Sequence, residues 1–272
     1  MIDLHCHLLP GIDDGARSID MALLMASMAA SDGITVTACT PHIVPGVYHN
    51  EGSAIRAAVA KLQGAISDAG IPLRLVTGAD VHIAPDLGVR LRSGMALTLN
   101  DTRYFLFEPT HHILPPRLED LTFDLMAAGY VPILTHPERL TWIDGHYELV
   151  KKLAQSGLLI QVTAGALTGR FGRRPKYWAE RILDEGLCDI LATDAHDPEH
   201  RAPRLHEGRV LAAQRLGEVE ATNLVVTRPG AILNNLSPAQ LPPRPAAARA
   251  GPTGEGEGSF ARVFNRLRGH RR

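Results

Sequence analysis

The chain has 272 residues, of which 45% are hydrophobic and 21% charged, and its formal net charge is −1 at pH 7. This composition is typical of a globular protein with a substantial core, and the near-neutral charge gives no reason to expect nucleic-acid binding. The sequence has no run of about 18 apolar residues, so we expect no transmembrane helix. The first residues lack a basic region followed by an apolar run, so we expect no secretory signal. Only three scattered cysteines are present, so we expect a cytoplasmic protein without a disulfide framework.

Helix-like segments, glycines and short apolar runs alternate from residue 1 to residue 217. Strands are expected over residues 2–5, 34–40, 73–81, 104–108, 131–135, 158–163 and 188–193. Helices are expected over residues 18–31, 51–69, 117–128, 147–156, 177–185 and 205–216, with Ser18 as the first N-cap and a glycine after each. Alternation of this kind predicts an α/β fold in which parallel strands are covered by helices.

Nearly every expected strand ends in a polar residue of the kind that binds metal ions. A barrel of parallel strands gathers such residues at its C-terminal face. An open, doubly wound sheet would concentrate them at one switch point instead. We therefore expect residues 1–236 to form one distorted (β/α) barrel, similar to a TIM barrel.

The composition changes after residue 236. Residues 237–272 are rich in Pro, Ala, Gly and Arg; they hold seven Arg against two Glu, a net charge of +5, which leaves −6 for the rest of the chain. This composition predicts a disordered tail. Within the tail, apolar residues at helical spacing among five arginines predict a short basic amphipathic helix over residues 260–272, which would touch a membrane surface weakly or bind a partner.

The first and last expected strands end in the same pattern. His5 and His7 are two residues apart, so in a strand both point to one face while Cys6 points to the other. Asp194 and His196 repeat this spacing, and Asp14 lies in a glycine-bounded turn after the first strand. Imidazole and carboxylate ligands without thiolate suit Mn, Fe or Zn. The remaining strand ends contribute His42, Asp80, Glu108 and His136, which is more than one metal ion needs.

The motifs that contain these residues are similar to those of a known protein family. They are His5-x-His7 with Asp13-Asp14-Gly15, Thr40-Pro41-His42, Thr135-His136-Pro137-Glu138-Arg139, Thr168-Gly169-Arg170-Phe171-Gly172 and Thr193-Asp194-Ala195-His196. In order and spacing the chain resembles, over residues 1–236, the PHP-superfamily protein-tyrosine phosphatases of capsule and exopolysaccharide clusters, the CpsB/CapC group.

The resemblance implies a PHP-type (β/α)7 barrel with three divalent metal ions, usually manganese. Arg139 and Arg201 match arginines at the rim of the site, and Arg204, one helical turn further on, is an alternative to Arg201. Position 80 is usually Glu in this family, and Asp80 shortens the reach by about 1.5 Å, so one metal would bind more weakly here. The implied ligands are His5, His7, Asp14, His42, Asp80, Glu108, His136, Asp194 and His196.

Phosphate-monoester chemistry fits such a site. Metal ions would neutralise the phosphate charge and acidify a water to a pKa near 7, while Arg139 and Arg201 would bind the non-bridging oxygens. A phenolate leaving group needs little acid assistance because its pKa is about 10. Asp194, His42 or a water could protonate it. A cysteine-dependent phosphatase is excluded, because none of the three cysteines is followed six positions later by Arg.

We therefore expect a phosphatase that acts on phosphotyrosine in protein. By resemblance, the partner would be a bacterial tyrosine kinase that controls capsule or exopolysaccharide biosynthesis. One alternative is a PHP-type phosphatase for a small phosphate monoester such as histidinol phosphate. A second alternative is a metal-stabilised regulator that binds the kinase without turnover.

Overall fold

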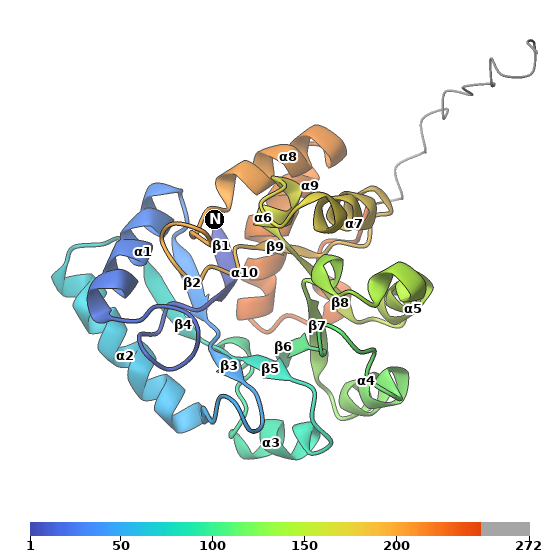
Figure 1. Ribbon diagram of the computed structural model, residues 1–272, viewed down its shortest axis with the longest axis horizontal. Helices are drawn as coiled ribbons and strands as arrows, with labels where there is room; N and C mark the ends of the chain where they lie inside the picture. Colours follow the sequence, from blue (N-terminus) through green and yellow to red (C-terminus); the bar gives the residue numbers. More distant parts are fainter. Residues whose placement is uncertain (246–272) are drawn as a thin grey trace, which may run out of the picture.

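The structure is a computed structural model that describes residues 1–245, and in it helices surround a set of parallel strands (Figure 1). Every pairing between named strands is parallel. The strands are β1 (Ile2–Cys6), β2 (Val36–Cys39), β3 (His42–Ile43), β4 (Arg74–Thr77), β5 (Asp80–His82), β6 (Tyr104–Glu108), β7 (Val131–Thr135), β8 (Leu159–Thr163) and β9 (Ile190–Ala192). The helices are α1 (Ile19–Ser31), α2 (Gly52–Asp68), α3 (Leu87–Ser93), α4 (Leu118–Ala127), α5 (Ile143–Gln155), α6 (Ala164–Leu167), α7 (Arg173–Asp184), α8 (His206–Leu216), α9 (Glu218–Thr222) and α10 (Arg228–Leu233).

The strands form two ladders, in the orders β1-β2-β4 and β3-β5-β6-β7-β8-β9. The ladders close on each other because the end of β1 meets the segment after β9. There the N–H of His7 donates to the carbonyl of Ala195 at 2.9 Å, and the N–H of Asp194 donates to the carbonyl of His5 at 2.8 Å. The predicted distorted barrel of parallel strands with covering helices is confirmed, and so is the Ser18 N-cap, whose hydroxyl accepts from the N–H of Met21.

One predicted strand is wrong. Residues 73–81 form two strands, β4 and β5, rather than one, and β3 is an additional short strand. Pairing between the neighbours stops after Cys39 and Thr77 and resumes at His42 and Asp80. The break falls at Pro41, which has no N–H to donate to a ladder, and its carbonyl accepts from the N–H of Asp80 at 3.1 Å.

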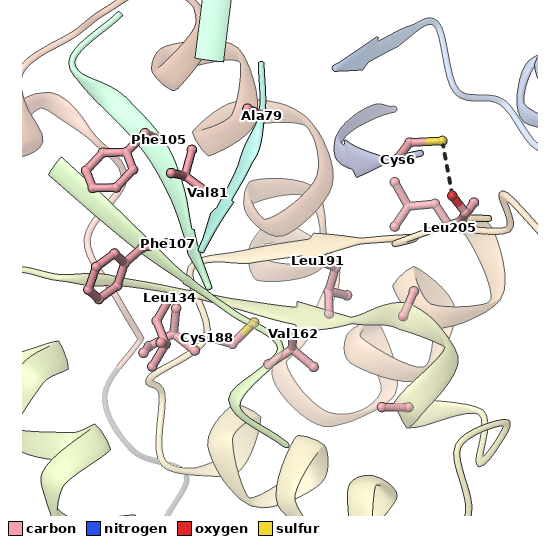
Figure 2. Packing of buried hydrophobic residues seen from close by; sticks show 14 of the residues in the cluster. Cys6, Ala79, Val81, Phe105, Phe107, Leu134, Val162, Cys188, Leu191 and Leu205 are labelled. Carbon is pink, nitrogen blue, oxygen red and sulfur yellow. Dashed lines mark hydrogen bonds between the residues drawn. The ribbon is translucent and has the colours of Figure 1, made fainter. Parts of the chain in front are cut away.

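The strands separate two apolar clusters. Phe105 and Phe107 of β6 point to one side, in the larger cluster with Leu134, Val162 and many helix residues (Figure 2). Tyr104 and Leu106 alternate with them and lie in the smaller cluster on the other side. Because Glu108 shares the parity of Leu106, the same alternation directs its carboxylate toward the inside of the barrel at the C-terminal end.

The segment after residue 217 closes the other end of the barrel. Ile232 and Leu233 of α10 pack in the smaller cluster with Leu4 and Tyr104. Residues 237–245, which composition assigns to the tail, also contact the barrel: the guanidinium of Arg244 pairs with both oxygens of Asp189 at 2.9 and 2.6 Å. The composition of this segment did not indicate that contact, because it depends on one arginine and a buried partner. The predicted basic helix over residues 260–272 lies outside the described residues.

Candidate metal centre

The structure brings all the predicted ligand side chains together at the C-terminal ends of the strands. They come from β1 and the turn after it, from β3, β5 and β6, and from the segments after β7 and β9. Their ligand-type atoms fall into overlapping groups in which every atom lies within 4.8 Å of the others. These groups are His7–Asp14–His42–His196, His5–His7–Asp80, His5–His136–Asp194 and His42–Asp80–Glu108.

The spacing between nitrogen and oxygen atoms is nearly uniform across the cluster. The Nε2 atom of His5 lies 3.4 Å from Asp80 and 3.3 Å from Asp194, and Nδ1 of His42 lies 3.3 Å from Glu108. At the opposite side, Nε2 of His196 lies 3.4 Å from Asp14. Two ligands that each sit about 2.1 Å from one ion, at a tetrahedral angle, are about 3.4 Å apart. The pairs therefore have the separation that shared ligation requires.

The cluster also contains buried polar atoms that the protein leaves without hydrogen-bond partners. Within residues 1–245 these include both carboxylate oxygens of Asp80, Nδ1 of His42 and Nε2 of His196. Burying such groups without a partner costs several kcal/mol, whereas binding a divalent cation satisfies them. The residues present therefore fit a multinuclear metal site.

Asp80 faces two of the groups despite its short side chain. Its Oδ2 lies 3.4 Å from Nε2 of His5 and 3.5 Å from Nδ1 of His42. The side chain is fully buried, and the break before β5 places it opposite His42 in the β3–β5 pair. The loss of one methylene relative to Glu therefore leaves this carboxylate within the cluster.

Two residues outside the predicted set orient the histidines. Asp13 Oδ2 accepts a hydrogen bond from Nδ1 of His7 at 2.7 Å, and Gln161 Oε1 accepts from Nδ1 of His5 at 2.9 Å. Each bond leaves Nε2 of its imidazole facing the cluster, as is usual for metal-binding histidines. Gln161 had a sequence signal, because it is the single amide in an otherwise apolar strand core. For Asp13, the sequence signal was its position directly before Asp14, a predicted ligand.

The two predicted rim arginines converge on one carboxylate. Arg139 and Arg201 both donate to Oδ2 of Asp194, the second at 2.5 Å. The ring of Phe171 lies beneath both guanidinium groups, with its centroid 4.7 Å from Cζ of Arg139 and 5.9 Å from Cζ of Arg201. Arg204, the alternative, lies away from this cluster in a surface hollow with Asp32.

Close packing of opposite charges shifts the pKa values of the cluster. Burial alone would lower the pKa of His5, but the carboxylates of Asp194 and Asp80 raise it to about 9. Burial opposes protonation of His42 too, and Glu108 and Asp80 raise its pKa to about 10. Burial would raise the pKa of Asp194, yet His5 and the two arginines hold it well below its usual range. Without metal ions, His5 and His42 therefore hold protons near neutral pH while Asp194 stays ionised.

Two of the predicted ligands sit on strained backbone. His136 has φ of 35° and Asp194 has φ of 49°, both in the left-handed region that residues other than glycine rarely adopt. His136 directly follows β7 and Asp194 is the second residue after β9, so each left-handed residue redirects the chain at the mouth of the barrel. Strain of this kind is concentrated at functional sites.

Cys6, which lies between the two N-terminal histidines, points away from the cluster. Its thiol packs in the larger apolar cluster and contacts the carbonyl of Ala195 at 3.9 Å (Figure 2). Burial raises the pKa of this thiol well above its ordinary value, so it stays protonated and unreactive.

Comparison with known proteins gives a consistent assignment. Residues 1–234 match the family described as capsular polysaccharide synthesis, CpsB/CapC, which confirms the resemblance drawn from the motifs. The tyrosine-protein phosphatase YwqE of Bacillus subtilis is 34% identical over 92% of this chain and 98% of its own length. The tyrosine-protein phosphatase CpsB of Streptococcus pneumoniae is 23% identical over 86% of this chain and 98% of its own length.

A solved structure agrees with these relatives. It comes from the crystal structures of YwqE from Bacillus subtilis and CpsB from Streptococcus pneumoniae, described as unique metal-dependent tyrosine phosphatases. It superposes with a TM-score of 0.85 at 32% identity, over 91% of this chain and 98% of that one.

Proposed function

The chain belongs to the CpsB/CapC family, and from this membership we propose that it is a metal-dependent phosphatase that hydrolyses phosphotyrosine in protein. The observation that carries the proposal is the ring of imidazoles and carboxylates spaced 3.3 to 3.6 Å apart at the mouth of the barrel. We propose three divalent ions, manganese in the first place, held by the predicted ligands. Such ions would supply charge neutralisation for the phosphate dianion and a water of lowered pKa.

The chain's own cations would bind and orient the phosphate. Arg139 and Arg201 are partly exposed, with 15% and 24% of their side chains accessible. Each guanidinium has five N–H donors, so after pairing with Asp194 each keeps donors for phosphoryl oxygens. Phe171 holds both groups in place by cation–π contact.

The leaving group needs little help from the protein. A tyrosine phenolate has a pKa of about 10, well below that of an aliphatic alcohol. Expulsion of phenolate therefore proceeds with the charge stabilisation that the cluster provides, while serine esters would react more slowly.

A hollow beside the cluster supports a protein substrate over a small one. Its volume is about 630 Å³, and it lies between the segments that follow β5 and β6. Ile83 and Ile113 line it, and the N–H of Ile83 donates to the carbonyl of Glu108 at 3.0 Å, so the hollow adjoins the cluster. It can bury an apolar residue next to phosphotyrosine in a polypeptide, whereas histidinol phosphate has no such residue.

The biological setting follows from the same relationship. We propose a bacterial tyrosine kinase of polysaccharide production as the substrate protein, because the matching family is that of capsular polysaccharide synthesis. None of the helices in residues 1–245 combines the length and the hydrophobicity that a membrane span requires. The three free, buried cysteines support a location in the reducing cytoplasm.

The test is a hydrolysis assay with added manganese, in which phosphotyrosine peptide, phosphoserine peptide and histidinol phosphate are compared and bound metal is measured. We expect rapid turnover of the phosphotyrosine peptide, slower turnover of the phosphoserine peptide and no turnover of histidinol phosphate. Hydrolysis of histidinol phosphate with the peptide untouched would show the small-molecule alternative, and kinase binding without turnover would show the regulator. His136→Ala should abolish turnover without changing the circular dichroism spectrum, whereas the exposed control His146→Ala should remain active.

A further inference from the structure

Glu108 faces a second imidazole that lies outside the predicted ligand set. Its Oε1 is 3.6 Å from Nε2 of His136 and 3.4 Å from Nε2 of His111. These separations match those elsewhere in the cluster, and Glu108, His111 and His136 form a group of ligand-type atoms within 4.8 Å of one another. The other oxygen, Oε2, lies 3.3 Å from Nδ1 of His42, so Glu108 spans two groups.

The backbone holds His111 in this position. The carbonyl of His111 accepts from both the N–H and the hydroxyl of Thr141, at 2.9 and 3.0 Å. The carbonyl of Thr110 accepts from the indole N–H of Trp142 at 2.9 Å. Thr141 and Trp142 closely follow the turn that carries His136, so the loop after β6 is tied to the same segment as the facing imidazole. A side chain on a free surface loop would not have this support.

His111 completes a group of three ligand-type side chains with Glu108 and His136. Asp80 belongs to two other groups, one with His5 and His7 and one with His42 and Glu108. His136 is 2% exposed, and its Nδ1 has no hydrogen-bond partner in the part of the chain that the structure describes. In the group with Glu108 and His136, the imidazole of His111 supplies the third ligand-type atom, which is the number of protein ligands that catalytic zinc sites usually provide.

We propose that His111 is a direct ligand of the metal ion held by Glu108 and His136. This inference rests on the proposed metal-dependent function and adds a ligand that the resemblance does not supply. The side chain of His111 is 32% exposed, so this metal position lies at the solvent side of the site, where a substrate phosphate arrives.

The test is a titration of the metal-free protein with Mn²⁺, in which free Mn²⁺ is followed by electron paramagnetic resonance. In His111→Ala, we expect one class of bound Mn²⁺ to weaken by about tenfold to 100-fold or more, while the other classes keep their affinity. The matched control is His112→Ala, because His112 is the exposed neighbour on the same loop. Circular dichroism of each variant checks the fold.

A second variant separates direct ligation from mere orientation of Glu108. His111→Gln keeps an N–H donor for the carboxylate but lacks the imidazole, so a direct ligand predicts the same loss as in His111→Ala. Wild-type Mn²⁺ affinity in His111→Ala, or full recovery in His111→Gln, would overturn the proposal. Those results would leave the proposed phosphatase intact, whereas a wild-type protein that binds no Mn²⁺ would overturn both.

Discussion

Replacement of Asp13 by Asn tests whether residues behind the cluster set its metal affinity. The Asp13 carboxylate accepts three hydrogen bonds: from Nδ1 of His7 at 2.7 Å, from the N–H of His42 at 3.1 Å and from the N–H of Gly15 at 2.9 Å. The amide has the same shape but only one accepting oxygen. In Asp13→Asn, at least one of these donors must therefore lose its partner.

The three hydrogen bonds are divided unequally between the two carboxylate oxygens of Asp13, and this division decides how large the effect of Asp13→Asn is. His7 and His42 both donate to Oδ2, and Gly15 donates to Oδ1. If the amide nitrogen replaces Oδ2, His7 loses the acceptor that keeps Nε2 free for a metal. Loss of such an orienting partner typically lowers metal affinity by about tenfold to 100-fold, or about 1.4 to 2.7 kcal/mol. If the amide nitrogen instead replaces Oδ1, the N–H of Gly15 loses its acceptor, which lowers the folding stability by about 1–3 kcal/mol.

The assay is calorimetric titration of Mn²⁺ into metal-free wild type, Asp13→Asn and the exposed control Asp20→Asn, with urea unfolding of each. We expect weaker Mn²⁺ binding or lower stability in Asp13→Asn, and wild-type behaviour in Asp20→Asn. If Asp13→Asn matches the wild type in both measurements, the orienting role of Asp13 is refuted.

Three further predictions follow from the same structure. The pKa values of His5 and His42 are raised to about 9 and 10, so both imidazoles are protonated near pH 7.5 in the metal-free site. Because Mn²⁺ must displace these protons, its binding should release protons and should weaken as the pH falls. Calorimetry in buffers of different ionisation enthalpy measures this release, and a buffer-independent heat would contradict it. Arg244→Ala should lower the free energy of unfolding by about 1–3 kcal/mol with kcat unchanged, because the substitution removes the ion-pair partner of Asp189. Urea denaturation measures this change, and an unchanged midpoint would show that the contact between Arg244 and Asp189 is not stabilising. Ile113→Asp should raise KM severalfold for a phosphotyrosine peptide with apolar flanking residues but not for p-nitrophenyl phosphate, and equal effects on the two substrates would exclude the hollow as a peptide contact.

The periodic pattern of the chain was enough to predict the barrel, because parallel strands and covering helices have strong local signals. The strand break at Pro41 was harder to predict. Residues 73–81 are predicted as one strand from the sequence, and only the pairing of β3 with β5 shows that the ladder restarts at Asp80. Residues 237–245 were also beyond prediction, since their contact with the barrel depends on Arg244 reaching Asp189.

The ligand-type residues were predictable because each stands at the end of an expected strand, and barrel topology alone brings such positions together. Sequence spacing, however, carries no information on which pairs face one another. The sequence by itself determined the barrel, the family and the identity of the residues around the mouth. Tertiary structure alone decided that Asp80 lies between His5 and His42, that Asp13 and Gln161 orient the imidazoles, and that His111 faces Glu108. The physical reason is that these contacts join segments far apart in the chain, or lie in a loop whose course depends on its neighbours.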